Sequence, residues 1–179
     1  MMIEDGKGSG RKAGVDEDNH LQVLAHTETI IALKNWEEGK CWSFPLDGLA
    51  PSGATKFFYI LNTGTTNIGL AVIRIASSAA GVFRFTKVTG TAAGGTAVAA
   101  VPVNLESTLS PAATILSGTS ITGLTDAGIL YPMYVPANSI VSTELIARWL
   151  VPPGTAMAIT APGAAVVNGM ILAYSSDAA

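Results

Sequence analysis

The fold class is decided by residues 56–88, which read KFFYILNTGTTNIGLAVIRIASSAAGVFRFTKV. Three runs in this stretch, 56–62, 68–76 and 82–88, are rich in β-branched and aromatic residues, and the short segments between them consist of Gly, Ser, Thr, Asn and Ala. Such runs, bounded by turn-forming residues, are typical of β-strands. The stretch therefore predicts a meander of three antiparallel strands.

The second and third runs differ in their alternation. In the third run, Phe83 and Phe85 alternate with Arg84 and Thr86, which predicts one buried and one solvated face. In the second run, residues 70–75 are apolar on both faces except for an arginine at the last outward position. We therefore expect the second strand to lie in the interior of its sheet.

Further strands are predicted on both sides of this stretch. Before it, an apolar alternation begins at Leu21, and residues 41–46 form a short strand whose Pro45 indicates a sheet edge or a strand end. After it, the patterns predict strands at 97–103, with Pro102 where no ladder donor is needed, at 113–116, 128–131, 143–151, 155–160 and 166–174. Prolines in 125–139 exclude a central strand or a helix through that segment. The alternation in 143–151 favours a strand over a helix.

About eight to ten strands at regular spacing predict an all-β protein, an antiparallel β-sandwich or jelly roll. No repeat of fixed period is visible, which disfavours a solenoid or a propeller. The length of 179 residues suits one domain plus an extension. We expect the domain to span residues 21–179 and residues 1–20 to form an extended N-terminal attachment arm.

The charged residues are unevenly distributed. They make up 13% of the chain, against ~25% in ordinary soluble proteins, and residues 1–40 hold 13 of the 23. Only ten remain for the other 139 residues. A body with so few charges is expected to be covered by other protein, through homo-oligomerisation or in a larger lattice.

Composition also excludes several classes of protein. The mean hydropathy is +0.42, yet no window offers ~18 apolar residues free of charge, Pro or Gly clusters, so no transmembrane helix is expected. The N-terminus lacks the apolar core of a signal peptide, and Cys41 is the only cysteine, which favours assembly in a reducing cytoplasm. A net charge of −3 with dispersed basic residues predicts no direct nucleic-acid binding.

No motif in the sequence indicates catalysis or a cofactor. Gly6, Gly8 and Gly10 lack the strand and helix that a phosphate loop requires. His20 and His26 would lie ~20 Å apart on a straight strand, too far to share a metal ion. Cys41 has no activating neighbour and is interpreted as a buried structural residue. The carboxylates of the body are scattered without a close pair: Asp47, Glu106, Asp126, Glu144 and Asp177.

The aromatic residues of the first half of the body are interpreted as core and interface anchors rather than as a sugar-stacking platform. They are Trp36, Trp42, Phe44, Phe57, Phe58 and Tyr59.

Residues 1–20 are polar, glycine-rich and mixed in charge, so they cannot bury enough apolar surface to order on their own. Val15 and Leu21 stand where a strand could begin against a neighbouring sheet edge. We expect the arm to be disordered in the isolated subunit and to order on a neighbouring subunit, with Arg11 and Lys12 pairing to carboxylates there.

The run IEDGKGSGRKAGVDEDNHLQV, residues 3–23, resembles an N-terminal segment of structural proteins of tailed bacteriophages. It departs from the pattern at Gly14, where a lysine is common, and at His20, where an arginine is common. The resemblance implies a virion component attached to the head, neck or tail, often as a trimer. The positions that carry it are Glu4, Asp5, Gly6, Gly8, Gly10, Ala13, Val15, Asn19 and Leu21.

Three classes of function follow from these observations. The leading hypothesis is a non-enzymatic virion protein without cofactors, assembled in the host bacterial cytoplasm as a homotrimer that decorates the head or builds a neck collar. Its partners would be itself and other virion proteins, not nucleic acid or membrane. The alternative is a receptor- or carbohydrate-binding module of a fibre or spike, with Trp36 and Trp42 as stacking platforms. The third, a jelly-roll hydrolase, lacks visible paired carboxylates or metal ligands.

Overall fold

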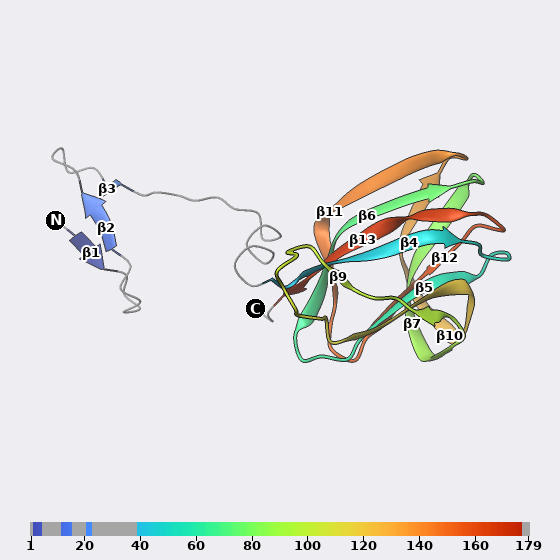
Figure 1. Ribbon diagram of the computed structural model, residues 1–179, viewed down its shortest axis with the longest axis horizontal. Coiled ribbons are helices and arrows are strands. Elements are labelled where there is room, and N and C mark those ends of the chain that lie inside the picture. The colour runs from blue at the N-terminus through green and yellow to red at the C-terminus, as the bar shows by residue number, and fades with distance from the viewer. Residues whose placement is uncertain (1, 5–11, 16–20, 23–38, 177–179) are drawn as a thin grey trace.

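The computed structural model describes residues 2–4, 12–15, 21–22 and 39–176, and this part of the chain is all β (Figure 1). No helix long and apolar enough to span a membrane occurs among these residues. The strands are β1 Met2–Glu4, β2 Lys12–Val15, β3 Leu21–Gln22, β4 Cys41–Leu49, β5 Lys56–Asn62, β6 Asn67–Ser77, β7 Gly81–Ala93, β8 Thr96–Ala97, β9 Val101–Pro102, β10 Ala113–Val135, β11 Ser139–Val151, β12 Ala156–Thr160 and β13 Val167–Ser176.

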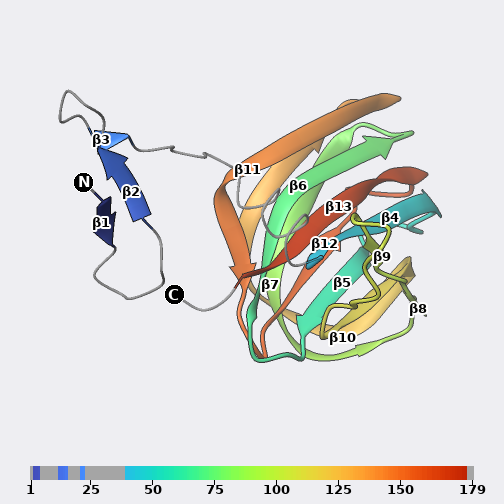
Figure 2. The same ribbon diagram turned by 60° about the vertical axis from the view of Figure 1, so that its left-hand side comes forward.

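The body consists of two five-stranded sheets packed as a sandwich (Figures 1 and 2). The first sheet has the order β11-β6-β13-β4-β9 and the second has the order β5-β12-β7-β10-β8. All pairings are antiparallel. The sandwich predicted from the strand spacing is thus confirmed, as are the strand at 143–151 and the interior position of β6, which lies between β11 and β13.

The predicted meander through residues 56–88 is wrong. Its three runs do form strands, but β5 and β7 belong to the second sheet whereas β6 belongs to the first. The chain crosses the sandwich twice, and β12, from the C-terminal part of the sequence, lies between β5 and β7. Alternation identifies which side chains are buried, but it carries no information on which distant strand supplies the hydrogen-bond partners.

The second sheet closes on itself through β10. The first part of this 23-residue strand pairs with β5 and the second part with β7, and bulges interrupt both registers. Because β12 joins β5 to β7 from the other side, the strands β5, β12, β7 and β10 form a closed ring. The ring has an apolar interior of its own, with Tyr59, Val88, Ile121, Ala156 and Ala158 at its centre.

Thr86 shows the consequence of this closure. The sequence places it on a solvated face with Arg84, but its side chain is buried, and its hydroxyl lies 3.4 Å from the carbonyl of Ala158. Thr86 and Val88 lie two residues apart on β7 and therefore face the same side, which the ring covers. Arg84 stands beyond the covered part and is exposed, as predicted.

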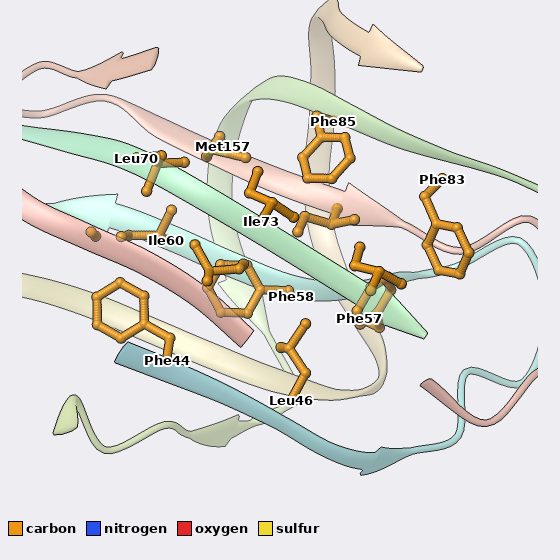
Figure 3. Packing of buried hydrophobic residues seen from close by; sticks show 14 of the residues in the cluster. Phe44, Leu46, Phe57, Phe58, Ile60, Leu70, Ile73, Phe83, Phe85 and Met157 are labelled. Carbon is orange, nitrogen blue, oxygen red and sulfur yellow. The ribbon is translucent and has the colours of Figure 1, made fainter. Parts of the chain in front are cut away.

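The main core lies between the sheets (Figure 3). Phe57 packs edge-to-face on Phe83, with ring centroids 5.9 Å apart. Phe57 and Phe58 are adjacent in sequence, yet both enter this core, because the β5–β12 register shifts beside them. The largest side chains of the core include Phe44, Phe57, Phe58, Ile60, Leu70, Ile73, Phe83 and Phe85.

Two strand prolines lie at free edges. β4 pairs with β9 only at Trp42 and Ser43, so Pro45 faces no second strand among those described, which confirms its predicted edge position. Pro132 lies inside β10, opposite Arg84 of β7. The predicted end of this strand before Pro132 is therefore wrong: the strand continues because an edge strand needs no ladder donor on its outer side.

Candidate interaction surfaces

The residues predicted to form the attachment arm lie only partly within the described residues. The structure pairs β1 with β2, with Glu4 opposite Lys12, and β2 with β3, with Val15 opposite Leu21. Asp5, Gly6, Gly8, Gly10 and Arg11 lie outside the described residues. The ordering of the arm on a neighbouring subunit stays a prediction.

The aromatic residues predicted as anchors are core residues where the structure describes them. Phe44, Phe57, Phe58 and Tyr59 are buried, and so is Trp42, whose indole nitrogen donates a hydrogen bond to the carbonyl of Leu109 over 3.0 Å. Trp36 lies outside the described residues. The interpretation of Trp42 as a core residue is thus confirmed, and its burial argues against the alternative hypothesis, in which its ring would stack on a sugar.

Cys41 is buried, which confirms its interpretation as a structural residue. The pKa of the Cys41 thiol is raised to about 11, because the effect of burial, which raises it, outweighs a backbone hydrogen bond with Trp42, which lowers it. The thiolate is the reactive form of cysteine, and a raised pKa leaves little of it near neutral pH. The position of Cys41 thus offers no support for nucleophilic chemistry.

The described carboxylates do not gather into a site. Asp47 lies on β4, Glu106 lies between β9 and β10, and Asp126 lies on β10. Asp126 forms an ion pair with Lys56, with 2.9 Å between Oδ1 and Nζ. No cluster of three or more His, Cys, Asp or Glu side chains in the described part of the chain could hold a metal ion. His20, His26 and Asp177 lie outside the described residues.

The most distinctive surface of the body is an apolar edge of the sandwich. From Gly128 to Val135, β10 pairs only with β7, and β11 pairs only with β6, so each strand has one side without a described strand partner. Residues 127–143 contain no charged residue. We call this surface the open edge, and its exposed apolar side chains are Ile129, Leu130, Tyr131, Tyr134, Ile140 and Leu150.

Proteins commonly protect free edge strands with charges, prolines or bulges. The open edge has Pro132 and register shifts at 126–128, 129–131 and 144–149. These features interrupt the row of backbone donors and acceptors, so they disfavour the addition of a continuous strand. They leave the apolar side chains in place, and the open edge therefore suits side-chain packing against another protein surface better than extension of the sheet.

An apolar pocket of about 200 Å³ lies at the open edge. Its lining includes Leu130 from β10, Trp149 and Leu150 from β11, Met157 from β12 and one charged residue, Lys87 of β7. Leu130 has no partner in the β10–β7 register, in which Ile129 and Tyr131 are paired with successive residues of β7. Such an extra residue in a bulge redirects its side chain, here to the pocket.

Aromatic contacts connect the pocket to the core. The rings of Tyr131 and Trp149 lie 5.6 Å apart, and both contact Phe85, with centroid distances of 6.2 Å and 5.4 Å. Phe85 is fully buried, whereas Tyr131 reaches the surface. The wall of the pocket thus rests on packed side chains, and a rigid wall lowers the entropic cost of binding.

A second apolar feature is the turn Asn104–Ser107 between β9 and β10. The amide of Ser107 donates to the carbonyl of Asn104 over 2.9 Å, and the amide of Glu106 donates to the Asn104 side chain over 3.0 Å. Leu105 stands at the tip of this turn with 89% of its surface exposed. A large aliphatic side chain is therefore held away from the body by a hydrogen-bonded turn.

Comparison with known proteins identifies no relative, because no protein-family model, curated protein or solved structure matches this chain.

Proposed function

We propose that this chain is a non-enzymatic structural subunit of a tailed-bacteriophage virion. In this proposal it assembles as a homotrimer, decorates the head or forms part of a neck collar, and attaches to its neighbours through residues 1–20. The open edge is the observation that supports it most. Six large apolar side chains lie on two consecutive edge strands, five of them in the uncharged stretch 127–143, and such a set is typical of a surface that another protein covers.

The distribution of charge supports the same proposal. Residues 1–40 have a net charge of −3, and residues 41–179 are neutral overall. A neutral body with exposed apolar strands is prone to associate, since net charge is what keeps proteins monomeric. A charged N-terminal segment joined to such a body suits a subunit that associates through the body and contacts a different neighbour through the arm.

The alternative of a carbohydrate-binding module has lost one of its two proposed platforms, because Trp42 is buried and hydrogen-bonded. The described side chains that line the pocket at the open edge are mostly apolar, and Lys87 is the one charged residue among them. We therefore retain the structural role as the single proposal.

The self-association part of the proposal is tested by size-exclusion chromatography with light scattering on the full chain. We expect a mass of three copies at micromolar concentration, and a substitution of Ile129 by lysine should reduce this mass. The matched control is Val101→Lys, which adds the same charge at an exposed apolar residue of β9, at the opposite end of the first sheet from β11. A monomer that persists at all concentrations would refute the trimer.

The attachment part of the proposal is tested by deleting residues 1–20. Since β1 and β2 pair, among the described strands, only with each other and with β3, the two sheets of the body should fold without them. We expect the truncated chain to remain oligomeric but to be missing from purified particles. Incorporation at the level of the full chain would show that the arm is not the attachment device.

A further inference from the structure

We infer that copies of this chain associate head to tail, with the turn Asn104–Ser107 of one copy inserted in the open-edge pocket of the next. Leu105 would fill the apolar pocket, and Glu106 would pair with Lys87 at its rim. The inference rests on the proposed self-association and specifies the two surfaces that make it. We call the turn Asn104–Ser107 the knob. The basis of the inference is that the knob and the pocket match each other in size, polarity and charge.

The match in size and polarity concerns Leu105. The pocket of about 200 Å³ is lined by Leu130, Trp149, Leu150 and Met157, which are apolar or aromatic. A volume of this size holds several water molecules, each of which takes ~30 Å³, and it therefore accepts a branched aliphatic side chain. Filling it with Leu105 would remove from water an 89% exposed leucine and the apolar lining together.

The match in charge concerns the next residue. Among the residues whose side chains the structure describes, Lys87 is the one charged residue that lines the pocket, and Glu106 directly follows Leu105. Both are exposed, and neither forms an ion pair within the described part of the chain. An apolar side chain followed by a carboxylate thus faces an apolar pocket with one ammonium group, which is a complementary pair of surfaces.

The turn is also held in place before binding. Ser107 donates from its hydroxyl to the carbonyl of Gly39 over 2.9 Å, and the amide of Val103 donates to the carbonyl of Cys41 over 3.0 Å. A side chain on Gly39 would collide with Ser107, so the close approach requires glycine there. Since the turn is tied to the body on both sides of Leu105, little entropy is lost when it docks.

Knob and pocket are different surfaces of the same chain, so the contact is heterologous. After the first contact the pair of copies still has one free knob and one free pocket, and such contacts produce a closed ring when the rotation between copies closes. A three-membered ring is the closed form that agrees with the proposed homotrimer. In this ring, each copy would use its knob in the contact with one neighbour and its pocket in the contact with the other.

The test uses two variants of the full chain, Leu105→Asp in the knob and Leu150→Asp in the pocket. Light scattering should show that each alone is shifted to monomer, with association weakened by on the order of 30-fold or more, as for interface hot spots. Mixed together, they should form a one-to-one dimer, because the intact knob of one fits the intact pocket of the other. Val166→Asp is the control for an added carboxylate on an exposed apolar residue outside both surfaces.

Exchanging the charges of Lys87 and Glu106 tests the proposed ion pair at the rim of the pocket. Lys87→Glu should weaken association by roughly two- to five-fold, and adding Glu106→Lys in the same chain should restore it. Circular dichroism should show an unchanged fold in all variants, since the substituted side chains are exposed or line the pocket.

If the wild-type chain is oligomeric but Leu105→Asp and Leu150→Asp leave its mass unchanged, or their mixture forms no dimer, the head-to-tail contact is refuted and the proposed function stands. A monomeric wild-type chain would refute both.

Discussion

The core between the sheets and the open edge use the same types of side chain in opposite situations. Phe57 and Phe83 are fully buried and pack edge-to-face, whereas Ile129 and Tyr134 have 63% and 61% of their surface exposed. Both sets lie on strands of one sheet. The core residues are explained by the fold of a single chain, and the edge residues are not, so the difference separates side chains that stabilise the subunit from those available to a partner.

Among the substitutions that test this difference, removing an aromatic ring from the core should have the largest effect on the stability of the subunit. Phe57→Ala would leave a cavity beside Phe83, and we expect it to lower the free energy of unfolding by ~3–5 kcal/mol. Tyr134→Ala, the matched edge substitution, should change it by no more than about 0.5 kcal/mol. Urea unfolding at a concentration where the chain is monomeric provides the measurement. Equal losses in the two variants would show that the edge is as much part of the fold as the core.

The second-largest loss of stability is expected at Asn62, a buried polar side chain whose hydrogen bonds join three segments of the chain. The Asn62 amide donates to the carbonyls of Thr66 and Val151 over 2.8 Å and 2.7 Å, and its oxygen accepts from the amide of Gly64 over 2.9 Å. Asn62→Ala leaves these buried groups unsatisfied, and we expect a loss of ~1–3 kcal/mol.

Asn168→Ala is the control for Asn62→Ala. Asn168 accepts one exposed hydrogen bond, from the amide of Gly48 over 2.8 Å, and its loss should be smaller in the same urea titration. A larger loss at Asn168 than at Asn62 would contradict the role assigned to the buried amide.

The ion pair of Lys56 with Asp126 should contribute less to the free energy of unfolding than the hydrogen bonds of Asn62. Asp126 has 53% of its side chain exposed and Lys56 has 17%, so solvent screens the interaction. We expect Asp126→Asn to lower the free energy of unfolding by ~0.2–1 kcal/mol in dilute buffer and by less in high salt. A loss that does not depend on salt would indicate that Asp126 acts through something other than its charge.

The smallest change in stability is expected at the open edge itself. Ile129→Ser should change the free energy of unfolding of the monomer by no more than about 0.5 kcal/mol, because Ile129 is largely exposed. The same substitution should still weaken self-association, which analytical ultracentrifugation over a dilution series would detect. If it destabilised the monomer as strongly as Phe57→Ala, the proposed distinction between core and edge would fail.

Much of the strand content was predictable from residues alone. The run 56–62 coincides with β5, and 82–88 lies inside β7. The same reasoning recognised 143–151 as a strand but divided β10 into the pieces 113–116 and 128–131, and it ended the second piece at Tyr131 because Pro132 looked like a strand end. A proline excludes a second ladder partner, and only the finished sheet shows that β10 has none at that point.

The candidate surfaces were less predictable. The low charge of residues 127–143 is visible in the sequence, but an apolar run can equally be core, as 68–76 shows. Leu105 follows Asn104, a good turn former, and nothing in the sequence shows that its side chain points to solvent. The pocket combines residues from β7, β10, β11 and β12, which meet only after the sheets have formed.

The amino-acid sequence by itself determined which segments are extended, that the body is a β-sandwich and that its surface would be short of charge. These properties follow from local alternation, turn residues and composition. Only the tertiary structure decided that β6 crosses to the opposite sheet, that β10 closes a ring with β5, β12 and β7, and that β10 and β11 keep an open edge. The reason is that strand pairing depends on which distant backbones meet, and every extended segment offers similar donors and acceptors until packing selects its partners.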